Sequence, residues 1–224
     1  MKLIVFDLDG TLTETYAVDE EAFVRTMADE FGIENMSTNW AGYPHATDLA
    51  IVHDLHEQKF GREPDRDDIE RFKNRMTRYL QEGMRRSGGM RSIAGVSEML
   101  ETLNADPCYA VAIATGAFDR SAELKFRSGD LDVDGIPIAT SDDGTSRADI
   151  VRVAVKRAKQ QYGCNEFERV VCVGDGTWDL ETARELGYGF IGIGTGTQAD
   201  MLRRAGAVHV IGCYSDLGSF LSLL

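Results

Sequence analysis

The chain has 224 residues, of which 43% are hydrophobic and 27% are charged. This is the composition of an ordinary globular protein, and it excludes an intrinsically disordered or fibrous chain. The 24 basic residues stand against 37 acidic ones, which gives a formal net charge of −13. We therefore expect no nucleic acid and no membrane as a partner, because so acidic a surface repels both. The composition leaves a monomer and a dimer equally open.

The N-terminal residues and the cysteines indicate a cytoplasmic protein. The first apolar run covers residues 3–6 and stops at Asp7, whereas a signal peptide needs roughly 7–15 apolar residues. No run approaches the roughly 20 apolar residues of a membrane span. The cysteines form no CxxC pair, and we interpret them as reduced thiols; they are Cys108, Cys164, Cys172 and Cys213.

Short, continuous apolar runs predict strands that are buried on both faces of a parallel sheet. The first covers residues 3–6, and similar runs follow at 109–114, 136–139, 170–173, 190–193 and 208–211. Helical spacing of apolar residues separates several of these runs, as at 96–103, 150–158 and 180–186. Strands that alternate with helices predict an α/β fold with a doubly wound parallel sheet.

Residues 14–91 break this alternation. Their apolar residues follow helical spacing in three places, around 23–31, 51–55 and 69–80, with no strand-like run between them. A connection between parallel strands rarely needs so many residues. We therefore predict an α/β core domain of residues 1–13 and 92–224, and an all-helical second domain of residues 14–91 inserted after the first strand.

Two aspartates follow the first predicted strand, in the run Asp7-Leu8-Asp9-Gly10-Thr11. Residues two apart in an extended chain point to the same side, so both carboxylates face one way. Carboxylates this close repel each other, and a bound divalent cation usually offsets that repulsion. A plain Asp-Gly turn at a strand end is the alternative interpretation.

A second acidic motif follows the run at 170–173. Asp175 and Asp179 are four residues apart where a helix begins, so both can face the crevice at the strand end. Carboxylate oxygens are the ligands that hard cations such as Mg²⁺ prefer. A helix cap and a first-turn acid would explain the same two residues without a metal.

Polar residues stand at two further strand exits. Thr115 and Gly116 follow the run at 109–114, where a hydroxyl and free backbone N–H groups can bind an anion. Arg147 lies at the start of a predicted helix over 146–161, and its guanidinium could orient a carboxylate and neutralise a phosphoryl group. A solvated helix charge is the alternative for Arg147. Because ligands of open α/β sheets bind at the carboxyl ends of the strands, we expect these groups to share one site.

Together these motifs resemble the haloacid dehalogenase (HAD) superfamily, and the helical insert resembles its type 1 cap, as in phosphoglycolate-phosphatase-like members. The resemblance implies that Asp7 is a nucleophile that forms an aspartyl-phosphate and that Asp9 is the general acid and base. It also implies a Mg²⁺ cofactor, held by the Asp7 carboxylate, the backbone carbonyl of Asp9 and Asp175, with Asp179 supporting the metal shell.

The resemblance further implies that Thr115 and Gly116 hold the phosphoryl oxygens. Family members mostly carry Lys where this chain has Arg147, and the usual following Pro is absent, so Lys125 is the alternative for the basic position. The run 42–48 resembles the specificity loop of the cap, which implies that Tyr43 and His45 contact the leaving group. A helix start capped by Thr47 or Asp48 explains that run equally well.

The function implied by the resemblance is a Mg²⁺-dependent phosphatase that hydrolyses a small, soluble phosphomonoester metabolite. A phosphomutase of the β-phosphoglucomutase type is the nearest alternative, since it would use the same residues. A non-catalytic binding protein on the same fold is a third, and its expected mark is the loss of a catalytic carboxylate. A dehalogenase is disfavoured, because those members lack the second aspartate, here Asp9.

Overall fold

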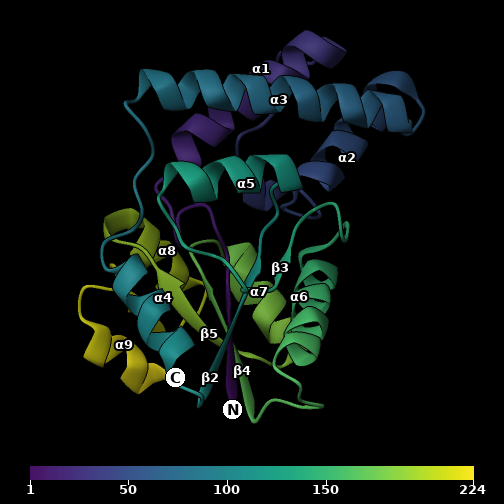
Figure 1. Cartoon of the computed structure of the whole chain (residues 1–224). Helices are drawn as coiled ribbons and strands as arrows, with labels where there is room; N and C mark the ends of the chain where they lie inside the picture. The colour runs from purple at the N-terminus through teal and green to yellow at the C-terminus, as the bar shows by residue number, and fades with distance from the viewer.

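The computed structural model describes all residues 1–224, and its helical cap stands over one edge of an α/β core (Figure 1). The six strands form one parallel sheet in the order β3-β2-β1-β4-β5-β6. Their bounds are β1 Lys2–Phe6, β2 Tyr109–Ala114, β3 Ile138–Ala139, β4 Arg169–Gly174, β5 Gly189–Ile193 and β6 His209–Ile211. The predicted doubly wound α/β fold is confirmed.

The strand order reverses between β1 and β4, and this fixes where the sheet can bind a ligand. Phe6 of β1 pairs with Val173 of β4, and the backbone N–H of Asp7 donates to Val173 O at 2.9 Å. The two acidic motifs of the sequence therefore leave the sheet side by side.

Side chains that alternate along β1 enter two different cores. Ile4 and Phe6 pack with one set of helices and Leu3 and Val5 with the other, as expected for a strand covered on both faces. Figure 1 shows α4 and α9 on one side of the sheet and α6 and α7 on the other. The first set is α4 Val96–Ala105, α5 Asp119–Ser128 and α9 Leu217–Leu223, and the second is α6 Arg147–Gln161 and α7 Thr177–Leu186. Helix α8 Gly196–Arg204 packs on α7 in a smaller cluster that holds Leu180 and Leu202.

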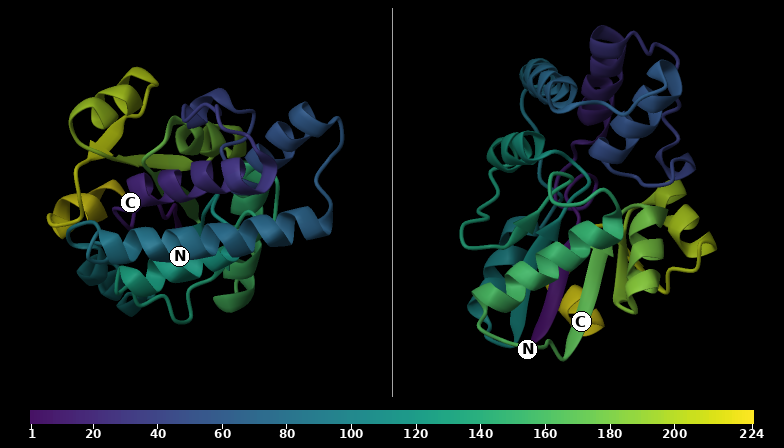
Figure 2. Two further views of the ribbon diagram at one scale, coloured as in Figure 1. Left: turned by 90° about the horizontal axis from the view of Figure 1, so that it is seen from above. Right: turned by 90° about the vertical axis from the view of Figure 1, so that its right-hand side faces the viewer.

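Three helices and a short 3-10 turn lie between β1 and α4 and form the cap. They are α1 Tyr16–Phe31, η1 Trp40–Gly42, α2 Asp48–Phe60 and α3 Arg66–Arg86. Their apolar faces share a core of their own that includes Phe23, Met27, Phe72 and Met76. Phe118, which directly precedes α5, is buried in this same cluster, and Figures 1 and 2 show α3 lying against α5. The cap therefore packs on the core through α5.

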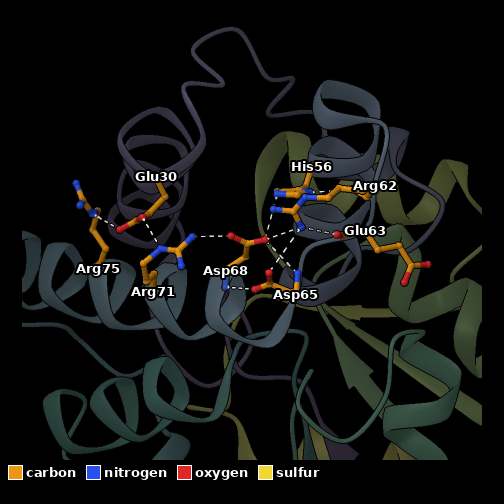
Figure 3. Close-up of polar contacts among 8 residues, drawn as sticks. All are labelled: Glu30, His56, Arg62, Glu63, Asp65, Asp68, Arg71 and Arg75. Atoms are coloured by element: carbon orange, nitrogen blue, oxygen red, sulfur yellow. Dashed lines mark hydrogen bonds and ion pairs between the residues drawn. The ribbon is translucent and has the colours of Figure 1, made fainter.

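A network of polar side chains joins the three cap helices (Figure 3). Asp68 of α3 accepts hydrogen bonds from Arg62 at 2.8 Å and from Arg71 at 2.5 Å. His56 of α2 lies 3.5 Å from the same carboxylate, and its other ring nitrogen lies 3.0 Å from the carbonyl oxygen of Arg62. Arg71 also reaches Glu30 of α1, at 3.7 Å. His56 and Asp68 are buried, whereas the side chains of Arg62 and Arg71 are about half exposed, so the network runs from the interior of the cap to its surface.

The two chain segments that join the cap to the core run next to each other. Glu14 N–H donates to Arg91 O at 2.8 Å, and Ile93 N–H donates to Leu12 O at 2.9 Å. An antiparallel bridge between Thr13 and Ser92 lies between these bonds. None of the helices in the structure is both long and apolar enough to cross a membrane.

Candidate active site

The loop after β1 brings Asp7 and Asp9 to the carboxyl edge of the sheet. Asp7 is buried, and Gly10 adopts a φ of 76°, a conformation that glycine tolerates at little cost. A Cβ at Gly10 would lie 2.3 Å from Asp175 Oδ2. The glycine therefore allows this loop to pass directly beside the second acidic motif.

Three buried carboxylates meet at this point. Asp7, Asp175 and Asp179 each offer one oxygen, and these oxygens lie within 4.8 Å of one another. Asp175 Oδ1 is buried without a hydrogen-bond partner. Burial, together with the charges of neighbouring carboxylates, raises the pKa of Asp175 and raises that of Asp179 to about 7. An unpartnered oxygen among crowded acids is what a divalent cation satisfies, so these residues fit Mg²⁺.

Asp179 serves a second purpose. Its Oδ2 accepts the backbone N–H of Gly176 at 3.0 Å and so caps the start of α7. The capping interpretation and the metal interpretation thus apply to the same residue. A Cβ at Gly174 would lie 2.4 Å from Asp179 Oδ2, so glycine at the end of β4 lets this side chain fold back to the sheet edge.

Arg147 lies against the Asp7 carboxylate. Ser146 caps α6 by accepting the backbone N–H of Asp149, which places Arg147 in the first turn. Its guanidinium NH1 lies 2.7 Å from Asp7 Oδ1 and 3.4 Å from Asp179 Oδ1. Burial raises the pKa of Asp7, and the Arg147 charge opposes that rise. Arg147 is therefore part of the acidic cluster and is not a solvated helix charge.

Lys125 takes a different partner from Arg147. Its side chain is fully buried, with Nζ 2.7 Å from Asp9 Oδ2 and 2.6 Å from Asp19 Oδ1 of the cap helix α1. Burial alone would lower the pKa of Lys125, but the Asp19 and Asp9 carboxylates outweigh it and raise that pKa. The other oxygen of Asp9 accepts the Thr15 hydroxyl. The two basic residues considered from the sequence are thus both at the site, one at each aspartate of the first motif.

Thr115 and Gly116 lie at the end of β2, in different roles. Thr115 is buried, and its hydroxyl accepts the backbone N–H of Ala117 at 3.1 Å. Gly116 reaches the cavity above Asp7. A Cβ at Gly116 would lie 2.7 Å from Ala46 O of the cap and 2.9 Å from Arg147 NH2. Gly116 therefore lets the cap loop approach the core closely.

The cap loop at residues 46–48 is hydrogen-bonded to the core. Thr47 Oγ1 donates to Thr145 O at 2.7 Å, and Asp48 N–H donates to Gly116 O at 2.8 Å. Asp48 Oδ2 accepts the backbone N–H of Phe118 at 3.0 Å. Thr47 also caps α2 by accepting the backbone N–H of Ala50, so Thr47 and not Asp48 is the helix cap. This loop closes the cap over the strand ends.

The structure does not bring Tyr43 and His45 to Asp7. Tyr43 donates its hydroxyl to Ser37 O at 2.8 Å, and its ring stacks on Trp40. Both Tyr43 and His45 line a groove of about 310 Å³ beside α7, which adjoins the cavity above Asp7 and shares Arg147 and Trp178 with it. Neither residue lines that cavity itself.

A cavity of about 70 Å³ lies between the core site and the cap. Burial, followed by the charge of Asp19, raises the pKa of Asp48 in its wall to about 8. Burial also raises the pKa of Asp19 to about 6, although the positive charge of Lys125 lowers it in part. The core contributes Asp7, Asp9, Gly116, Ala117, Arg147 and Trp178 to the wall, and the cap contributes Tyr16, Asp19, Glu20, Phe23, Trp40, Ala46, Thr47, Asp48 and Ile51.

Asp19 was missed by the sequence analysis, and Asp48 was considered only as a helix cap. Both lie in the first turn of a helix, where an acid is common for reasons of helix stability alone. The sequence indicated Lys125 only as the alternative to Arg147 for the basic position. None of these three side chains shows a spacing in the sequence that marks a site.

Comparison with known proteins agrees with this geometry. The family model of haloacid dehalogenase-like hydrolases matches residues 1–187. No curated protein matches the chain. A hydrolase from Pseudomonas syringae has a similar structure, with a TM-score of 0.72 at 23% identity over 99% of this chain and 98% of that one.

Two further crystal structures share the fold. One is a predicted phosphoglycolate phosphatase from Haemophilus somnus, with a TM-score of 0.66 at 18% identity over 99% of this chain and 98% of that one. The other is a HAD family hydrolase from Deinococcus radiodurans with bound phosphate and sodium, with a TM-score of 0.59 at 24% identity over 99% and 96%. Since the family model covers most of the sequence and the fold agrees, the chain belongs to the haloacid dehalogenase-like hydrolases.

Proposed function

We propose that this hydrolase is a Mg²⁺-dependent phosphatase acting on a small phosphomonoester through an aspartyl-phosphate on Asp7. The observation that carries the proposal is the grouping at one cavity of Asp7, Asp9 and Arg147, with Asp175 and Asp179 beside Asp7. A nucleophile, a separate acid and base, and a cation for the phosphoryl group are the parts that this reaction needs.

The first step transfers the phosphoryl group to the enzyme. The Asp7 carboxylate attacks phosphorus, the ester P–O bond breaks, and the leaving oxygen takes a proton from Asp9. Arg147, 2.7 Å from the Asp7 carboxylate, orients it and offsets the phosphoryl charge. Asp7, Asp175 and Asp179 would hold Mg²⁺, which when bound supplies positive charge to the phosphoryl oxygens.

The second step returns Asp7 to its starting state. The Asp9 carboxylate takes a proton from water, and the oxygen of that water attacks phosphorus. The acyl phosphate bond breaks and releases inorganic phosphate. Asp9 thus gives a proton in the first step and takes one in the second, and Lys125, 2.7 Å from it, fixes the position of its carboxylate.

Residues 14–91 serve in this proposal as a cap that selects the leaving group, and residues 1–13 with 92–224 serve as the catalytic core. Water is the acceptor in this proposal, and a phosphomutase of the β-phosphoglucomutase type, which would use the same residues, is the alternative. A small metabolite as the partner and a cytoplasmic location, consistent with the free cysteines, are parts of the same proposal.

The test is phosphate release from a panel of phosphomonoesters with Mg²⁺, with the Asp7→Asn variant as the blank. The proposal expects release by the wild-type protein alone and no requirement for a bisphosphate activator. A requirement for such an activator would favour the phosphomutase. No release from any ester, or equal release by Asp7→Asn, would refute the proposal.

A further inference from the structure

The part of the cavity wall that comes from the cap is acidic and carries no basic residue. Asp19, Glu20 and Asp48 line it from α1 and α2. Of the basic side chains at the site, Arg147 is paired with Asp7, and Lys125 is paired with Asp9 and Asp19. Neither Glu20 nor Asp48 has an ion-pair partner: half-buried Glu20 accepts only the Trp40 indole N–H, and burial raises the pKa of Asp48 to about 8. The cap side of the cavity therefore holds more acids than bases, and a bound cation would favour their charged forms.

Aromatic rings surround the same carboxylates. Tyr16, Phe23 and Trp40 from the cap and Trp178 from α7 line the cavity. Trp40 donates its indole N–H to Glu20 Oε2 at 3.1 Å, and its ring meets Phe23 edge to face at 5.7 Å. Ring faces attract cations, and carboxylates do so more strongly. Carboxylates among aromatic rings form a surface that binds an organic cation.

The size of the cavity bears on which leaving group could carry the cation. A water molecule needs at least ~10–15 Å³ of such a volume, so about 70 Å³ holds several waters or a short chain of two or three carbons with a terminal nitrogen.

We infer that the leaving group of the substrate carries a cationic nitrogen, so that the substrate is a small amine-bearing phosphomonoester. This inference rests on the proposed phosphatase function. The phosphoryl group lies at Asp7 and Arg147, and the ammonium group lies among Glu20, Asp48 and the ring of Trp40. The same wall disfavours a leaving group with a carboxylate, such as that of phosphoglycolate, because like charges would face each other.

A neutral leaving group with hydroxyls is the alternative occupant. Carboxylates also accept hydrogen bonds from hydroxyls, so this alternative would use the same residues. It would leave the Asp48 carboxyl group protonated at neutral pH, whereas a cation beside it would favour the charged form. Binding of a cationic leaving group depends on the charge of these carboxylates, whereas binding of a neutral one depends on it much less. The test uses this difference.

The experiment compares kcat/KM for three esters of equal chain length: phosphoethanolamine, ethyl phosphate and phosphoglycolate. Acetyl phosphate is measured beside them as a report on phosphatase activity alone. We expect phosphoethanolamine to exceed ethyl phosphate by on the order of 10-fold and phosphoglycolate to be slowest. Phosphocholine in a further arm separates a primary from a quaternary ammonium group.

The matched variants are Asp48→Asn and Glu20→Gln, which keep shape and remove charge. Each should lower the ratio of phosphoethanolamine to ethyl phosphate by several-fold, with acetyl phosphate turnover changed much less. Glu57→Gln removes the same charge from an exposed position on α2 and should leave the ratio unchanged. A loss of folding alone would lower all substrates together and would not move the ratio.

The outcomes separate the two proposals. Turnover of acetyl phosphate with no preference for the amine, or a preference unaffected by Asp48→Asn and Glu20→Gln, overturns the cation inference and leaves the phosphatase in place. If no ester is hydrolysed, the proposed function fails. Calorimetric titration of phosphoethanolamine and ethyl phosphate into the wild-type protein then decides the binding question: tighter binding of the amine supports the cationic pocket, and equal or weaker binding refutes it.

Discussion

Arg147 and Asp7, which are 140 residues apart in the chain, are joined by a hydrogen bond of 2.7 Å at the carboxyl edge of the sheet. The same guanidinium donates through Nε to Ala46 O of the cap at 2.8 Å. One side chain therefore contacts both the nucleophile proposed in the core and the loop that closes over it.

We expect Arg147→Met to lower kcat/KM by about 10²–10³, because removing one buried partner of a charge pair costs about 2–5 kcal/mol. Arg147→Lys should retain part of the activity, since it keeps a cation near Asp7. Arg152→Met, at an exposed position of α6, is the matched control and should behave as wild type. Steady-state phosphate release measures all three. Full activity in Arg147→Met would show that Asp7 needs no cation from α6.

Asp7→Asn should abolish turnover without lowering thermal stability. Burial raises the pKa of Asp7, which means that the folded protein disfavours the charged form, so a neutral amide of the same shape costs the fold little. The amide cannot form an acyl phosphate. Phosphate release and a thermal melt by circular dichroism check the two halves of this prediction. A large drop in Tm would make the loss of turnover uninformative, and Asp7→Glu would then replace it.

Mg²⁺ should raise the Tm of the wild-type protein, and Asp175→Asn should remove most of that rise. At 100 times Kd a ligand stabilises the folded state by about 2.7 kcal/mol, which is roughly 5–10 °C for a chain of this size. The reason is the unpartnered oxygen of Asp175 among three acids. Asp200→Asn, on the exposed side of α8, is the control. An unchanged Mg²⁺ response in Asp175→Asn would remove this residue from the metal site.

Lys125 and Asp19 should be strongly coupled in stability. Lys125→Met leaves Asp9 and Asp19 as unpaired acids and should cost about 3–5 kcal/mol, as breaking a buried pair does. Combining it with Asp19→Asn should cost less than the sum of the two single variants, with a coupling of about 0.5–3 kcal/mol. Urea unfolding of the four proteins gives the cycle. Simple additivity would mean that the contact of 2.6 Å carries no interaction energy.

The cap network predicts a loss of stability in acid. Burial would raise the pKa of Asp68, but hydrogen bonds from the Asp65 backbone, Arg62 and Arg71 outweigh it and lower that pKa to about 2. A lowered pKa in the folded state stabilises the protein above the usual value of 3.8, and this contribution disappears as the pH falls through about 2.

We therefore expect Asp68→Asn to cost roughly 1.5–3 kcal/mol at neutral pH and progressively less between pH 4 and about pH 2. His56 and Glu30 face the same network. For that reason the quantity to compare is the difference between wild type and variant at each pH. Asp67→Asn, at an exposed position on α3, is the control. Its difference in stability from wild type should not shrink as the pH falls.

The sheet was predictable because its strands are apolar on both faces, a pattern that few other elements share. The run at 136–139 gave only the short strand β3 Ile138–Ala139, and Pro137 explains the shortening because proline has no N–H to donate to a ladder. The bounds of helix α5 were not predicted. Its inward face mixes Ser121 and Lys125 with Ala122 and Phe126, all buried, so the apolar periodicity that marks a helix is weak there.

The core of the candidate site was also predictable, whereas its cap side was not. Asp7, Asp9, Asp175 and Asp179 stand at strand ends in short motifs, and the sheet topology alone brings strand ends together. Asp19 and Asp48 reach the cavity from helices whose position depends on packing between α3 and α5. Tyr43 and His45 line the adjoining groove, while Thr47 and Asp48 are the residues of this segment that are hydrogen-bonded to the core.

The paired segments at Glu14 and Arg91 have a mechanical consequence. The two adjacent chain crossings are hydrogen-bonded to each other and so form a single two-stranded connection between cap and core. Any separation of the two domains would have to break the contacts of residues 46–48, the pair between Lys125 and Asp19 and the packing of α3 on α5. All of these contacts lie within one chain, so their re-formation would be unimolecular and independent of the protein concentration.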